Sequence, residues 1–127
     1  MRSQEPYANL PVWQESLDFV KEIYLLTNLL PEEEKAALSQ RMRNAAIEAV
    51  VHLSKFFTSK HMPASLSSVK DAYHHLNELE ILLRICQALG YISQDDTERY
   101  TEKVAEMNRQ VSMLVRKIER EKELESD

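Results

Sequence analysis

Turn-forming and cross-linking residues are scarce in this chain of 127 residues, which contains one glycine, four prolines and one cysteine. A single cysteine excludes an internal disulfide bond and suits a reducing compartment. Few turn formers indicate few, long elements. The apolar runs are short and interrupted by charge, so nothing resembles a signal peptide or a membrane span. We therefore expect a cytoplasmic protein with long elements and no membrane contact.

The composition and charge limit the class of protein further. Hydrophobic residues make up 43% of the chain and charged residues 29%, which is far from the composition of a disordered protein. A single domain of this length buries roughly two-thirds of its unfolded surface, so its stability requires no disulfide and no metal. The net charge of −5 argues against attraction of nucleic acid to the whole surface. A local basic face remains open.

Apolar residues at intervals of three and four predict four helices. Pro11 and Pro31 suit the first turn of a helix, and the glutamates after Pro31 favour the positive end of the helix dipole. Gly90 fits the left-handed position just after a helix, and Ser93 with Asp96 has the spacing of an N-terminal cap. The predicted helices span 11–29, 32–58, 66–89 and 94–121, after an irregular arm at 1–10.

These lengths predict a bundle. Helices of about 18 to 28 residues are roughly 27 to 42 Å long at 1.5 Å per residue, so they match one another. Short connections at Pro31 and at Gly90 make consecutive helices antiparallel. The longest loop is expected between Thr58 and Ser68, and it is a good position for a functional contact. The expected fold is an all-α, up-down-up-down four-helix bundle, with residues 1–127 in one domain.

The third predicted helix carries more apolar residues than a small bundle can bury. Its main stripe runs from Val69 to Cys86 at helical spacing, and we expect Cys86 to fill the core. Further apolar residues lie off this stripe, and a second such strip lies on the second helix. Two strips of this kind indicate a subunit interface. The predicted interface residues are Ile47, Val51, Ile81, Ile85 and Ala88.

Several short segments resemble one family. They are LPVWQES at 10–16, IYLLT at 23–27, PEE at 31–33, LNELE at 76–80 and LGYI at 89–92. Together they are similar to the four-helix bundle proteins encoded in intervening sequences of bacterial large-subunit ribosomal RNA genes, over about residues 9–93. The resemblance implies a small cytoplasmic bundle that assembles as a ring, commonly of five subunits. It also implies a fold similar to that of retroelement accessory proteins, which bind a reverse transcriptase and nucleic acid.

The second helix departs from the family pattern. The family usually has a pair of arginines, a proline and an Asn-Ile-Ala-Glu-Gly segment there. This chain keeps Arg43 but has Asn44 beside it, and VHLSKF follows at 51–56. An uninterrupted helix replaces the missing segment, so the expected fold is unchanged. Any function that the family carries in that segment does not transfer to this chain.

Residues able to bind metal occur on the second and third helices. Asp71 lies near His74 and His75 in the sequence, and Glu48 precedes His52 by one helical turn. Four-helix bundles that hold two metal ions use a Glu-x-x-His pair on each of two helices, and this chain contains no Glu-x-x-His. We therefore predict no metal and no cofactor. The histidines are interpreted as polar-face or interface residues, with a pH-sensitive contact as an alternative.

Catalysis has no support in the sequence. Cys86 lies among apolar neighbours, and a chain with one glycine has no glycine-rich loop to hold a phosphate. We therefore predict that the protein is not an enzyme. The first functional hypothesis is a homo-oligomeric scaffold or accessory subunit, and the resemblance implies a pentamer. A further protein partner is an open alternative.

The alternative hypothesis is an accessory protein that binds RNA or DNA, related to ribosomal RNA intervening sequences or to reverse transcription. A ring could present several copies of one basic patch. Glutamates interleave with the basic residues of the last helix, which is more typical of a solvated face. The candidate contact residues are Arg41, Arg43, Lys55, Lys60, Arg109, Arg116, Lys117 and Arg120.

Overall fold

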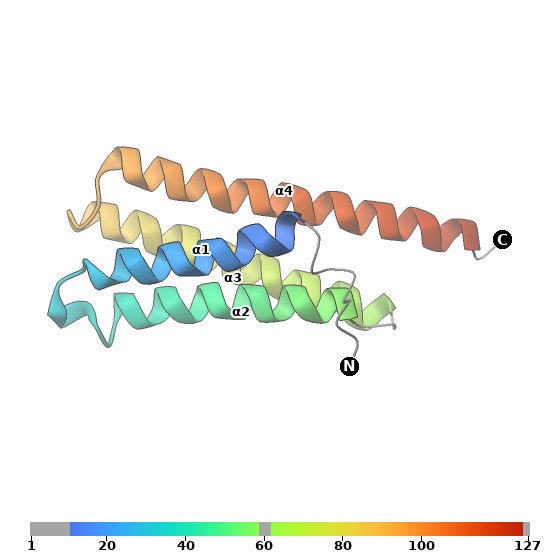
Figure 1. Cartoon of the computed structure of the whole chain (residues 1–127), viewed down its shortest axis with the longest axis horizontal. Helices are drawn as coiled ribbons and strands as arrows, with labels where there is room; N and C mark the ends of the chain where they lie inside the picture. The colour runs from blue at the N-terminus through green and yellow to red at the C-terminus, as the bar shows by residue number, and fades with distance from the viewer. Residues whose placement is uncertain (1–10, 59–61, 126–127) are drawn as a thin grey trace.

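The computed structural model describes residues 11–58 and 62–125, and these form an all-α protein. The helices are α1 (Pro11–Asn28), α2 (Leu38–Thr58), α3 (Met62–Ala88) and α4 (Gln94–Glu125), with a short 3-10 helix, η2 (Glu32–Glu34), between α1 and α2. Consecutive helices run antiparallel, and the C-terminal part of α4 extends past the start of α1 (Figure 1). The predicted up-down four-helix bundle is confirmed.

The beginning of the second helix differs from the prediction. The chain was expected to be α-helical from residue 32, but α2 begins at Leu38. Between them the backbone amides of Glu34 and Lys35 donate to the carbonyls of Pro31 and Glu32, three residues earlier, at 2.9 and 3.0 Å. Such three-residue hydrogen bonds tighten the backbone, and this lets the chain reverse direction between α1 and α2.

The prediction of the longest loop at 58–68 is wrong. α3 begins at Met62, so most of that segment is helical. The proline at Pro63 does not oppose this, because the first turn of a helix needs no amide donor. α4 also continues to Glu125 rather than ending at 121, since its last residues are good helix formers even without an apolar seam. The predicted arm at 1–10 lies outside the described residues.

Both predicted signals around Gly90 are confirmed. Gly90 has φ of 81°, and the amide of Tyr91 donates to the carbonyl of Cys86 at 2.9 Å, which closes the end of α3. Ser93 Oγ accepts a hydrogen bond from the amide of Asp96 at 3.0 Å and so caps α4. Tyr91 and Ile92 pack against the core. The chain therefore reverses within a few residues.

The core lies between the four helices, and each helix contributes a fully buried side chain to it. Ile23, Met42, Leu79 and Val104 are each 0% exposed. The predicted stripe of α3 is buried as well, and the Cys86 thiol lies 3.5 Å from the Met42 sulfur, as expected for a cysteine that fills the core. A cavity of about 20 Å³ remains near the alanines of α2. It holds about one water molecule, so it is too small for a substrate or cofactor.

Among the described parts of the chain, no helix combines the length and the hydropathy that crossing a bilayer requires.

Candidate functional site

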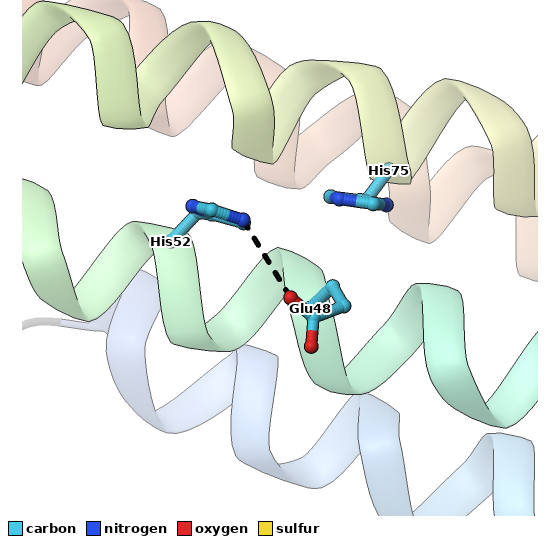
Figure 2. Close-up of side chains that lie close together, drawn as sticks. All are labelled: Glu48, His52 and His75. Atoms are coloured by element: carbon cyan, nitrogen blue, oxygen red, sulfur yellow. Dashed lines mark ion pairs between the residues drawn. The ribbon is translucent and has the colours of Figure 1, made fainter.

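Two imidazoles and one carboxylate converge between α2 and α3. Glu48 and His52 lie one turn apart on α2 and therefore share a face of that helix, while His75 comes from α3. Figure 2 shows the two rings between the helices and the Glu48 side chain over α2, with the His52 ring directed towards Glu48. One ligand atom from each residue lies within 4.8 Å of the other two. We call these three residues the histidine cluster.

The two rings of the histidine cluster are close neighbours. The His52 and His75 centroids are 5.5 Å apart and the ring planes differ by 10°. Nε2 of His52 lies 3.6 Å from a Glu48 oxygen. His74 is adjacent in sequence, and its ring stands edge-on to His75 with a centroid distance of 5.4 Å. His74 is exposed, whereas the side chains of His52 and His75 are 18% and 23% exposed.

A second carboxylate lies beside each ring of the cluster. Asp71 is 3.7 Å from Nδ1 of His52, and Glu78 is 3.5 Å from Nδ1 of His75. Both distances are too long for a hydrogen bond. The two Nδ1 atoms are buried and have no hydrogen-bond partner among the described residues. A buried nitrogen without a hydrogen-bond partner destabilises the fold, so these two atoms require an explanation.

The predicted interface residues lie on the outside of α2 and α3, where the structure describes them. Ile81 and Ile85 are 56% and 39% exposed, Val51 is also exposed, and Ile47 is half-buried. Ala88 is exposed. These placements agree with a surface role, and contact with a second copy stays a prediction.

Two exposed apolar groups were missed. Leu89 lies one turn after Ile85 and is 54% exposed, so it extends the same surface. On α1, Leu25 and Leu29 are 67% and 84% exposed. Leu25 and Leu29 are four residues apart and lie off the face that buries Ile23. This spacing in the sequence indicates an apolar strip on the outside of the helix.

Three of the predicted basic contact residues are engaged within the chain. Arg41 forms an ion pair with Glu78 at 3.0 Å. Arg43 donates to Thr27 Oγ1 and to Asn28 Oδ1, each at 2.7 Å. Arg109 binds the carboxylates of Glu102 and Glu106 at 3.1 and 2.6 Å, and its hydrogen bond lowers the pKa of Glu106. These guanidinium groups are therefore less available to an external phosphate.

The structure brings three other basic residues together near the C-terminal end of α4. Arg116, Lys117 and Arg120 line an open groove of about 640 Å³, and Pro11 and Val12 of α1 line it as well. The three residues are exposed and form no ion pair with any residue in the described ranges. Lys55 is exposed on α2, and Lys60 lies outside the described residues. This end of α4 therefore presents three exposed basic residues side by side with the groove.

Comparison with known proteins agrees with this architecture. The family model described as 23S rRNA-intervening sequence protein matches residues 8–113. A crystal structure of a protein of unknown function from the S23 ribosomal protein family of Bacteroides thetaiotaomicron superposes with a TM-score of 0.76 at 19% identity, and the match covers 83% of this chain and 95% of that one. At that identity the likeness concerns the fold.

A search of curated proteins gives no match. The family has no known catalytic activity, and its function is unknown. Because the family model spans most of the sequence, from the start of α1 into α4, this chain belongs to the 23S rRNA intervening-sequence protein family.

Proposed function

We propose that the chain acts in the cytoplasm as a non-enzymatic scaffold or accessory subunit, assembled with copies of itself into a ring of five. The observation that carries this proposal is the outer face of α3. Ile81, Ile85 and Leu89 follow one another at intervals of four and are 39% to 56% exposed. Single exposed apolar residues are ordinary, but two on α3 and a third directly after its end, in register, form a continuous strip. We call these three residues the α3 strip.

Closure into a ring requires two different surfaces on each subunit, because each copy contacts one neighbour on either side. The chain offers a second apolar surface on α2, where Ile47 and Val51 lie one turn apart. Burial of apolar area contributes roughly 25 cal/mol per Å². Contact between the α3 strip of one copy and an apolar strip of the next would remove both from water. The number five rests on the resemblance to ring-forming members of the family.

The assembly is tested by the mass of the purified full chain and of charged variants. Ile81→Glu and Ile85→Glu should lower the mass measured by light scattering after gel filtration, because each places a charge in the contact. Met113→Glu is the matched control, since Met113 is also an exposed apolar residue but lies on α4. A monomeric parent protein at cellular concentration would refute the proposal. Unchanged mass in both isoleucine variants would remove the α3 strip from the interface.

A second candidate function, RNA or DNA binding, is favoured by the groove at the end of α4. Arg116, Lys117 and Arg120 line that groove together. Combined replacement of these three by alanine should weaken binding of a fluorescent RNA or DNA strand and reduce its salt dependence. Arg109→Ala is the matched control, because Arg109 already pairs with two glutamates. No binding by the parent protein at low ionic strength would exclude this candidate.

A further inference from the structure

We propose that the histidine cluster binds a divalent cation of the zinc class across the α2 and α3 pair. Two imidazoles and one carboxylate form a donor set that Zn²⁺ accepts in proteins, with the fourth tetrahedral position left for water. Imidazole nitrogen also binds Zn²⁺ and its first-row neighbours more tightly than Mg²⁺ and Ca²⁺, which prefer oxygen ligands. All three donors belong to one chain, so the site does not depend on assembly.

The spacing of the donors requires only a small adjustment. Zinc bonds of about 2.0–2.1 Å in a tetrahedron place neighbouring ligand atoms about 3.3 Å apart. The Glu48 oxygen and His52 Nε2 are already 3.6 Å apart, and no two of the three ligand atoms are more than 4.8 Å apart. The Glu48 side chain is 47% exposed, so it is free to turn towards the ion. Rotation of the Glu48 side chain would bring its carboxylate closer to both rings.

The outer carboxylates lie close to the positions where zinc-binding histidines have their second layer of ligands. A histidine that binds metal through one nitrogen donates its other N–H to a carboxylate, which fixes the ring and increases its basicity. Asp71 lies beside Nδ1 of His52 at 3.7 Å. With a metal at Nε2, that buried Nδ1 carries the proton, and rotation of the exposed Asp71 side chain would bring the carboxylate within hydrogen-bond distance. Nδ1 of His52, which has no hydrogen-bond partner without the metal, would then donate to a carboxylate. Glu78 lies beside Nδ1 of His75 in a similar way, at 3.5 Å.

The local charge also favours a cation. Three carboxylates surround the two rings, those of Glu48, Asp71 and Glu78, and Arg41 neutralises Glu78 at 3.0 Å. Glu48 and Asp71 remain as negative charges beside two rings that are half-buried. A divalent cation would balance them at a position where protein donors replace part of its hydration shell.

The test is titration of the tag-free full chain with Zn²⁺ by calorimetry, with Mg²⁺ as the comparison ion. We expect one Zn²⁺ per chain, no Mg²⁺ binding at the same concentration, and a higher unfolding temperature with Zn²⁺. Loss of an outer partner of a zinc ligand costs about 10–100-fold in affinity, so Asp71→Asn should fall in that range. His52→Ala and His75→Ala each remove a ligand and should weaken binding by more than about a hundredfold.

His74→Ala is the matched control, because His74 neighbours the cluster in sequence and is exposed. It should bind Zn²⁺ like the parent protein. Absence of zinc binding by the parent would overturn the proposal. It would also be overturned if His52→Ala and His75→Ala bound Zn²⁺ as tightly as the parent. Co²⁺ loading of the parent gives a readout independent of variant folding. Intense visible absorption of tetrahedral Co²⁺ is expected, whereas the weak spectrum of octahedral Co²⁺ would refute the site.

Discussion

Alanine substitutions at Leu79 and at Ile81 should affect stability differently, because one residue lies in the core of the bundle and the other in its proposed interface. The two residues lie two positions apart on α3, but Leu79 is 0% exposed and Ile81 is 56% exposed. Truncation of a buried leucine leaves a cavity and costs about 2–5 kcal/mol. This is a large part of the roughly 5–15 kcal/mol that stabilises a typical domain. Full burial of an isoleucine contributes about 1.5–3 kcal/mol, so Ile81→Ala should cost about 1 kcal/mol or less in a single copy.

Urea denaturation at two protein concentrations measures both effects. The free energy of unfolding of the Leu79 variant should fall by the same amount at low and at high concentration, because its contacts lie within one chain. The loss in the Ile81 variant should grow with concentration, since assembly buries the rest of the side chain and couples to folding by mass action. Equal losses for the two variants would refute the burial argument. A loss at Ile81 that does not change with concentration would refute its place in an interface.

Three further predictions concern single positions. The Cys86 side chain is 0% exposed, and burial raises the pKa of its thiol to about 11. Iodoacetamide at pH 8 should therefore modify the folded protein far more slowly than the urea-unfolded chain. Equal rates would contradict this prediction. Gly90→Ala should lower the free energy of unfolding by about 1 kcal/mol, because alanine disfavours a φ of 81°. An added Cβ meets no atom within 4 Å, so no steric clash adds to this cost. An unchanged thermal midpoint would show that the turn tolerates alanine. Ser93→Ala should cost about 1 kcal/mol in thermal unfolding by removing the cap of α4, whereas Ser93→Asp should retain most of the stability.

The fold could be predicted from the sequence because local signals and apolar spacing agree. The stripe from Val69 to Cys86 specified the buried face of α3, and Gly90 and Ser93 specified the turn that follows it. The start of α3 was misplaced because Ser and Pro residues between 63 and 68 are read as loop formers. In the structure they form the first turns of a helix, where proline is tolerated and the packing of Val69 against the core favours continuation of the helix. Tertiary packing outweighed local propensity there.

The histidine cluster could not be predicted in this way. The sequence brings Glu48 and His52 onto one helical face, but nothing in it gives the register of α2 against α3. That register decides whether His75 faces His52 or lies a turn away from it. The paired Glu-x-x-His motif is also typical of sites that hold two metal ions, whereas the histidine cluster offers donors for one. Exposed residues such as Leu25 and Leu29 were missed for a related reason, since burial depends on which faces the neighbouring helices cover.

The two proposals draw on the same helix pair, yet they can fail independently. Charged substitutions in the α3 strip change none of the three residues of the histidine cluster, and His52→Ala or His75→Ala changes no residue of the strip. α2 and α3 also form the most extensively packed pair in the bundle. A cation held by Glu48 and His52 on one helix and His75 on the other would bind the two helices together at partly exposed side chains. If zinc binds, its stabilising effect should therefore persist in an Ile81→Glu monomer. Loss of zinc binding in that monomer would mean that assembly, rather than the fold of one chain, creates the site.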